Sequence, residues 1–144
     1  MVQNSLLTQF CSFAIMIPKK TITTPPKHLV TGRLGENLAV AFLQKKGWHV
    51  VAKNWKHGRG EIDIIAWETE NRLVFVEVKT RSSEAFGGPE GAVTAHKQAL
   101  IAKTAGLYME SVGYDWEIRF DVVAIVLCRG KLIELRHIED AFFP

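Results

Sequence analysis

The sequence predicts an α/β protein in which helices cover the faces of a mixed β-sheet. Two segments carry the 3.6-residue apolar period of a helix, and five shorter segments have the composition of strands. Their order along the chain is αβββαββ. Three strands with short connections favour an antiparallel meander, whereas the strand after the second helix is reached by a crossover. We therefore expect both kinds of strand pairing in one sheet.

Residues 1–30 are expected to form a flexible tail, which leaves residues 31–144 as a single domain. Residues 6–17 are apolar but too few to span a bilayer. The neighbouring lysines follow this run, whereas a secretory signal has its basic residues first. The Thr- and Pro-rich residues 21–27 have the composition of an extended linker. Met16 is a candidate for the true initiator, and an intact mass that begins at Met1 would exclude it.

The elements follow from apolar spacing and from the residues that interrupt it. The first helix is expected over residues 32–46, because Leu34, Leu38 and Phe42 repeat at the helical period and Gly47 occupies the position of a terminating glycine. A second helix is expected over residues 93–112, with a stripe of Ile101, Ala105, Tyr108 and Val112. Turn-forming residues separate the expected strands, which are residues 48–55, 61–67, 73–80, 118–128 and 131–138.

Glu77 and Lys79 interrupt the most apolar of these strands. Alternate residues of a strand share a face, so both side chains are expected to point the same way as Leu73 and Phe75. A Glu–Lys pair of this kind, taken alone, is usually a solvent-exposed ion pair. Its position in a strand expected to be covered on both faces raises a second interpretation, a functional site.

The preceding strand supports that second interpretation. Glu61, Asp63 and Ile65 are expected to share one face, and the short connection to the next strand can bring Asp63 beside Glu77. Two carboxylates in a partly buried place repel each other and resist ionisation unless a cation joins them. The two strands together therefore predict a cation site.

Mg²⁺ or Mn²⁺ fits the predicted ligands, because hard cations take oxygen ligands and retain waters. We expect Asp63, Glu77 and the carbonyl of Val78 to hold the metal. Lys79 can orient or deprotonate a water, or neutralise charge that develops on a phosphate. These residue types suit phosphodiester hydrolysis and require no nucleophilic side chain.

Further candidates each have an alternative explanation. Glu36, at the start of the first helix, can reach the metal through water or can simply complement the helix dipole. Lys97 can contact phosphate or remain a solvated lysine at a helix end. Asp121 interrupts another apolar strand, and a salt bridge with Arg119 explains it equally well. A basic rim that contacts phosphates, or only a solvated loop, is expected from Lys53, Lys56, Arg59 and Arg81.

Composition restricts the function classes without selecting one. The net charge is +3 and the pI is near 9.0, which permits a polyanionic partner without requiring one. Cys11 and Cys128 lack CxxC spacing, which argues against a disulfide framework or zinc cluster and favours a cytoplasmic location. The histidines show no zinc-binding spacing, and P-loop, GxSxG and GxGxxG motifs are absent from the sequence.

Several of these motifs resemble known families. Gly60-Glu61-Ile62-Asp63 and Phe75-Val76-Glu77-Val78-Lys79 are similar to the motif of PD-(D/E)XK nucleases, particularly the Holliday-junction-resolvase-like branch, although Ile62 stands where the motif's name has proline. Residues 31–126 resemble the YraN-like family of uncharacterised bacterial proteins. The matching stretches are Gly35-Glu36, Asn54, the two motifs above with Thr80-Arg81, Ala92-Val93, Lys97 and Arg119-Phe120-Asp121-Val122.

The resemblance implies a restriction-endonuclease-like fold with Asp63, Glu77 and Lys79 at the metal site and Glu36 as an accessory acid. The sequence is silent on oligomeric state, and a homodimer is a candidate because resolvase-like enzymes that cut two strands symmetrically usually dimerise. We expect a metal-dependent endonuclease that acts on nucleic acid, with DNA favoured and branched or damaged structures as candidate substrates, and with no membrane partner. A non-catalytic nucleic-acid-binding accessory is the second hypothesis, and a metal protein or interaction module without nucleic acid is the third.

Overall fold

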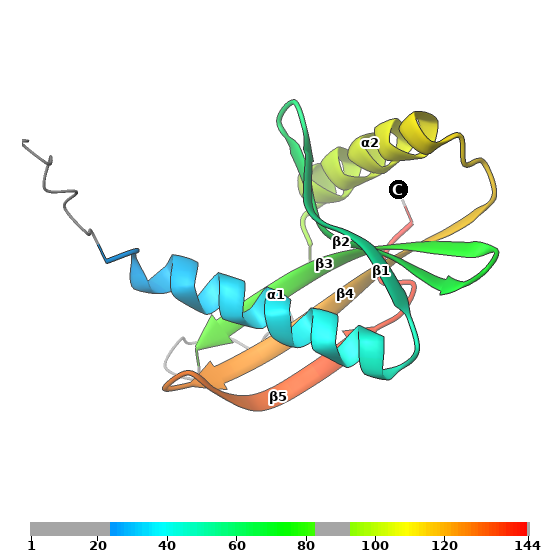
Figure 1. The fold of residues 1–144 in the computed structure, drawn as a ribbon. Helices are drawn as coiled ribbons and strands as arrows, with labels where there is room; N and C mark the ends of the chain where they lie inside the picture. The colour runs from blue at the N-terminus through cyan, green and yellow to red at the C-terminus, as the bar shows by residue number, and fades with distance from the viewer. Residues whose placement is uncertain (1–23, 83–92, 144) are drawn as a thin grey trace, which may run out of the picture.

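The computed structural model describes residues 24–82 and 93–143. The predicted tail up to residue 23, the candidate initiator Met16, and the loop of residues 83–92 lie outside the described residues. The elements follow the predicted order αβββαββ (Figure 1). Their bounds are α1 Lys27–Lys45, β1 His49–His57, β2 Gly60–Thr69, β3 Arg72–Ser82, α2 Ala95–Val112, β4 Glu117–Cys128 and β5 Lys131–Ile138.

Helix α1 begins at Lys27, before the expected domain boundary at residue 31. Pro26 precedes it with an extended backbone (φ −52°, ψ 140°), and a proline needs no partner for a backbone N–H at this point. The hydroxyl of Thr31 donates to the carbonyl of Lys27 within the first turns. Residues 27–30 are exposed, so this first turn of the helix adds no buried side chain to the core although its backbone is helical.

The five strands form one mixed sheet with the order β1-β2-β3-β4-β5. Strands β3 and β4 are parallel, and every other neighbouring pair is antiparallel. Helix α2 supplies the crossover that a parallel pair requires. The predicted α/β class and mixed pairing are both confirmed. No helix within the described residues is long and apolar enough to cross a bilayer.

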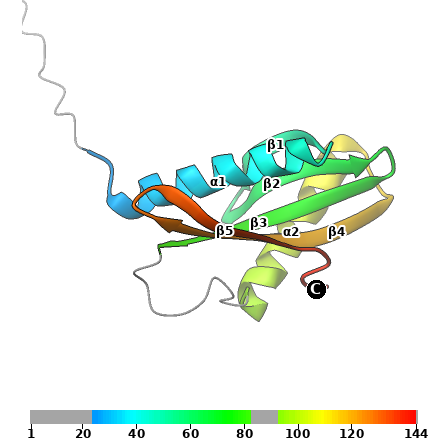
Figure 2. The same cartoon turned by 90° about the horizontal axis from the view of Figure 1, so that it is seen from below.

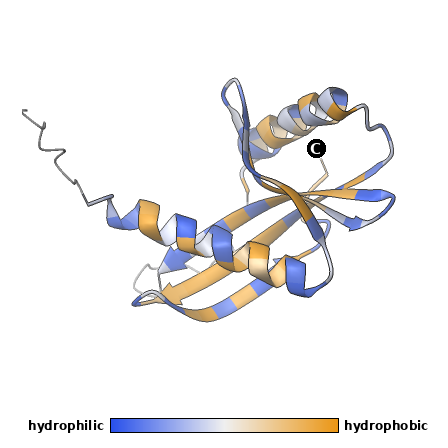
Figure 3. Ribbon diagram, viewed as in Figure 1, coloured by the Kyte–Doolittle hydropathy of each residue, from blue (hydrophilic) through white to orange (hydrophobic). Residues whose placement is uncertain are grey.

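Strand β3 lies at the centre of the sheet and divides the core into two halves. Val74 and Val76 pack with α1 on one face, while Leu73 and Phe75 pack with α2 on the other. The two helices therefore cover opposite faces, as the edge-on view shows (Figure 2). Figure 3 shows that β3 and β4 are hydrophobic over most of their length and that β3 becomes hydrophilic toward its carboxyl end.

The β1–β2 hairpin twists away from β3 and contacts α2 with its distal end (Figure 1). The paired residues of β2 and β3 end at Ile64 and Val76. Beyond them Ile62 packs in the same cluster as Ile65, whereas Ile64 belongs to the cluster on the α1 side. The expected strict alternation from Glu61 to Ile65 is therefore wrong, because the hairpin rotates after it leaves the ladder.

Two glycines allow this arrangement by bringing backbones close to threonine side chains. A Cβ atom at Gly35 would overlap the hydroxyl of Thr80, so α1 approaches the end of β3 closely. A Cβ atom at Gly60 would overlap the hydroxyl of Thr104, which lets the hairpin lie against α2. These approaches fix α1 and the hairpin on either side of the gap that opens between β2 and β3.

Candidate metal centre

Asp63 lies just beyond the end of the β2–β3 ladder, where its side chain takes the place of a backbone hydrogen-bond partner for β3. Its Oδ2 accepts a 2.7 Å hydrogen bond from the backbone N–H of Val78. In a strand the N–H and C=O of one residue point to the same side, so the carbonyl of Val78 faces the same gap. The expected neighbourhood of Asp63, Val78 and Glu77 is therefore present.

Glu77 is the second acid of this site, and its side chain is only 6% exposed. Lys79 places its Nζ 3.5 Å from Oε1, and Lys97 places its Nζ 3.5 Å from Oε2. Oε2 nevertheless accepts no hydrogen bond from any described residue. Buried carboxylate oxygens are normally satisfied, so this atom has capacity for a further cationic ligand.

The electrostatic situation of Asp63 also favours a cation. Burial raises the pKa of Asp63 from 3.8 to about 7, and repulsion from Glu77 adds to the rise. The hydrogen bond from Val78 and the charge of Lys97 oppose it, and Glu36 makes a small further contribution in the raising direction. A divalent cation between the two acids would remove the repulsion.

Glu36 faces a cleft rather than Glu77. Its Oε2 accepts a 2.9 Å hydrogen bond from the amide of Asn54 in β1. Asn54 has a left-handed backbone (φ 49°) although it lies within a strand, and asparagine tolerates this conformation better than most residues. This contact was not predicted from the sequence, because no periodic pattern signals a single left-handed residue inside a strand.

The cleft lies between the amino-terminal half of α1 and the β1–β2 hairpin. Its volume is about 510 Å³, and its lining includes Arg33, Glu36, Asn54, Lys56, Glu61 and Asp63. Asp63 is thus open to the cleft on one side and near Glu77 on the other. A molecule in the cleft can reach Asp63 without displacing the buried core.

The chemistry of this donor set fits Mg²⁺ or Mn²⁺. The available ligands are the carboxylates of Asp63 and Glu77 and the carbonyl of Val78, all of them hard oxygen donors. Within residues 24–82 and 93–143, no three His, Cys, Asp or Glu side chains converge as a complete cation cage. Mg²⁺ commonly binds through one or two carboxylates and keeps several waters, so an incomplete cage suits it better than Zn²⁺.

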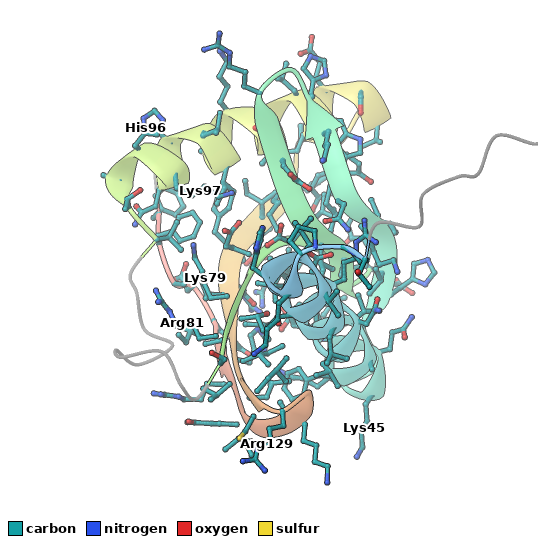
Figure 4. All side chains as sticks on the ribbon, turned by 90° about the vertical axis from the view of Figure 1, so that its left-hand side faces the viewer. Lys45, Lys79, Arg81, His96, Lys97 and Arg129 are labelled. Carbon is teal, nitrogen blue, oxygen red and sulfur yellow. The ribbon has the colours of Figure 1, made fainter. Side chains whose placement is uncertain are left out.

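The predicted basic residues fall into separate places. Lys79 and Arg81 on β3 lie along the same side of the molecule as His96 and Lys97 on α2 (Figure 4). Lys56 instead lies across the cleft, where it forms a 3.4 Å ion pair with Glu61. Arg59 is exposed in the turn of the hairpin. Of the expected rim, Lys56 thus lines the cleft, whereas Arg81 lies on the side of the molecule that carries Lys97.

Asp121 belongs to a separate, structural cluster. It is fully buried and forms hydrogen bonds with Arg119 (2.8 and 2.9 Å), with His137 (2.8 Å) and with the backbone N–H of Asp140 (3.0 Å). Burial alone would raise the pKa of Asp121, but these hydrogen bonds hold it below its usual range. The salt-bridge explanation of Asp121 is confirmed.

Comparison with known proteins places this chain in a family. The family model described as "Uncharacterised protein family UPF0102" matches residues 35–125, a range that extends from α1 to β4 and contains Glu36, Asp63, Glu77 and Lys97. The chain belongs to the UPF0102 family. This assignment confirms the resemblance to the YraN-like family.

Relatives of the UPF0102 family match this chain over nearly their whole length. A UPF0102 protein of Flavobacterium psychrophilum is 47% identical over 81% of this chain and 97% of its own. A UPF0102 protein of Bacteroides thetaiotaomicron is 40% identical over 82% of this chain and 96% of its own. A UPF0102 protein of Rhodococcus jostii is 42% identical over 80% of this chain and 98% of its own. The names of these three UPF0102 proteins state no activity.

Proposed function

We propose that this protein is a Mg²⁺- or Mn²⁺-dependent endonuclease that hydrolyses phosphodiester bonds in nucleic acid, with DNA favoured and branched or damaged structures as candidate substrates. The observation that carries the proposal is the pairing of Asp63 with the buried, incompletely satisfied Glu77. Such a pair is unfavourable without a cation. The motif resemblance to PD-(D/E)XK nucleases supports the same assignment.

The residues of the site have two different roles in this proposal. Asp63, Glu77 and the carbonyl of Val78 would hold the metal. When bound, a divalent cation supplies Lewis-acid polarisation of the phosphodiester and a more acidic water. The ammonium group of Lys79, which lies 3.5 Å from Glu77, stabilises negative charge on the phosphoryl oxygens or orients the attacking water. No side chain forms a covalent bond with the substrate in this scheme.

The cleft supports a path for one strand of the substrate. It opens on Asp63 and has Arg33 and Lys56 in its walls, so phosphates can be neutralised as the strand enters. Glu36 lines the same cleft, where its carboxylate accepts a hydrogen bond from the amide of Asn54. This position suits an accessory acid that acts through water.

The direct test is cleavage of a panel of branched, flapped, single-stranded and duplex DNA, with matched RNA strands, in Mg²⁺ or Mn²⁺. Wild-type protein should cut at least one structure, and Asp63→Ala and Glu77→Gln should abolish that cleavage. Glu134→Gln is the matched control, because Glu134 is an exposed acid on β5 that pairs with Arg136. Cleavage that survives in Asp63→Ala, or inactivity of clean protein across the panel, would contradict the proposal.

A non-catalytic nucleic-acid-binding protein is the second candidate. The basic side chains of Lys79, Arg81, His96 and Lys97 along one side of the molecule favour it (Figure 4). This function predicts binding that weakens with added salt, remains unchanged in Asp63→Ala and is accompanied by no cleavage. The same panel, read by fluorescence anisotropy, separates the two candidates.

A further inference from the structure

Two lysines neutralise Glu77 at equal distances, and they come from different elements of the fold. Lys79 lies on β3 two residues from Glu77, so the backbone of the strand keeps the two side chains on one face. Lys97 comes from the first turn of α2 and reaches Glu77 with a long side chain that is 34% exposed. The attachment of Lys97 therefore depends on a flexible side chain alone.

The contact of Lys97 with Glu77 is an ion pair without a hydrogen bond. Its Nζ lies 3.5 Å from Oε2, and Oε2 accepts no hydrogen bond from a described residue. Lys97 also lies close enough to Asp63 to lower the pKa of that carboxyl group. Its ammonium group thus contacts Glu77 directly and acts on Asp63 through its charge, and the contact with Glu77 is held by charge rather than by directional bonding.

Lys97 also has access to solvent on the side where other basic groups lie. Lys79, Arg81 and His96 lie along the same side of the molecule (Figure 4). An ammonium group released from Glu77 would remain among these side chains. Clusters of basic groups of this kind bind the phosphates of nucleic acid. A flexible lysine can reach such a phosphate and contact it as a point charge.

We propose that Lys97 is an exchangeable counter-ion, which occupies the place of the cation beside Glu77 and, when a divalent metal displaces it, binds a phosphate of the nucleic acid. The inference rests on the proposed function and adds a coupling between metal binding and nucleic-acid binding. Metal and nucleic acid strengthen each other's binding because Lys97 can serve Glu77 or a phosphate but not both. Coupling between two ligands is reciprocal, so either ligand can be used to detect it.

The first test measures metal affinity without nucleic acid. Mn²⁺ binding is titrated by calorimetry in wild type, Lys97→Met and Lys103→Met, the last being a control with an exposed lysine on the same helix. Removing a competing cation should tighten Mn²⁺ binding by about fivefold or more in Lys97→Met, at the lower end of typical coupling between sites. Lys103→Met should leave the affinity unchanged.

The second test measures affinity for a fluorescent four-way DNA junction. With EDTA, Lys97 is engaged by Glu77, so Lys97→Met should weaken binding less than about twofold. With Ca²⁺, which takes the same oxygen ligands, the same substitution should weaken binding by about fivefold or more. A lysine that simply contacts phosphate would give equal losses in both conditions.

The outcomes separate this inference from the proposed function. Asp63-dependent Mn²⁺ binding that is unchanged or weaker in Lys97→Met would overturn the counter-ion role and leave the metal site intact. Absence of Mn²⁺ binding in wild type would overturn both. If Lys97→Met fails to fold by circular dichroism, Lys97→Gln is used instead, because it also removes the charge while retaining a polar side chain.

Discussion

The backbone N–H of Val78 donates a 2.7 Å hydrogen bond to Oδ2 of Asp63, which joins β2 to β3 after their ladder has ended at Ile64 and Val76. The bond holds an acid in a place that is otherwise unfavourable for its charge. Burial and the nearby Glu77 raise the pKa of Asp63 to about 7 despite this hydrogen bond. The site is therefore maintained at a cost to the metal-free protein.

Replacing Asp63 with asparagine should stabilise the metal-free protein above neutral pH. An acid whose pKa rises on folding binds a proton more tightly in the folded state, so wild-type stability is lost as the pH rises from about 4 to 7. Asparagine retains an oxygen that can accept the hydrogen bond from the N–H of Val78. Because it carries no titratable proton, it does not lose stability as the pH rises. Because one pKa unit corresponds to about 1.4 kcal/mol, the advantage at pH 8.5 has an upper bound of about 4 kcal/mol.

Urea unfolding in EDTA at pH 5.5 and 8.5 checks this prediction. The stability difference between Asp63→Asn and wild type should grow with pH, while Glu134→Gln, an exposed substitution on β5, should show no such growth. Added Mg²⁺ should then raise the stability of wild type more than that of Asp63→Asn. A difference that shrinks with pH would contradict the pKa assignment.

Alanine at Gly35 should destabilise the protein because its Cβ would overlap the hydroxyl of Thr80 and force α1 away from β3. We expect a loss of about 1–3 kcal/mol, as for other overpacked sites. Gly32 is the matched control, since it lies in the same helix and a Cβ atom there would meet no atom within 4 Å. Gly32→Ala should stabilise the helix by about 0.5–1 kcal/mol. Equal effects in thermal unfolding would show that α1 does not approach β3 as described.

Substitutions at Asn54 should separate its backbone role from its side-chain role. Glycine and alanine both remove the hydrogen bond to Glu36, but only alanine resists the left-handed backbone at φ 49°. We therefore expect Asn54→Ala to be less stable than Asn54→Gly by about 1 kcal/mol. Chemical denaturation of the pair measures the difference, and a more stable alanine variant would contradict the assigned conformation.

Asparagine at Asp121 should be among the most destabilising polar substitutions in this chain. It removes the charge that Arg119 and His137 share in a fully buried position. Breaking a buried ion pair of this kind costs about 3 kcal/mol or more, whereas Glu134→Ala, at an exposed position of β5, should cost no more than about 1 kcal/mol. The lowered pKa means that the contribution of Asp121 is present above the unfolded pKa and declines as the pH falls. Denaturation midpoints at pH 4 and 7 test both statements.

Local signals in the sequence were sufficient for the elements and their order. Arg129 and Gly130 both have positive φ, the geometry of a two-residue hairpin turn, and the residues on either side begin and end strands as expected. The apolar run of β3 predicted a covered central strand, and Leu73 and Val74 are fully buried. Period and turn chemistry are local properties, which explains why they could be read without a structure.

The rest depended on relationships that local patterns do not contain. The rotation of the hairpin brought Ile62 to the α2 side, because strand twist accumulates and the alternation rule assumes a flat strand. Val112 was expected on the apolar stripe of α2 but is 53% exposed, whereas Ile101 and Ala105 of the same stripe are buried. The contacts of Asn54 with Glu36 and of Lys97 with Glu77 join different elements, so no spacing predicts them.

The hydrogen bond between Asp63 and Val78 spans only 15 residues, whereas Arg72 and Glu117 at the β3–β4 pairing are 45 residues apart. Short-range contacts form sooner than long-range ones during folding. A chain leaving the ribosome can therefore pair β2 with β3, which carry Asp63 and Glu77, before α2 delivers Lys97. In that order of assembly, Lys97 is the last of the charged groups around Glu77 to arrive.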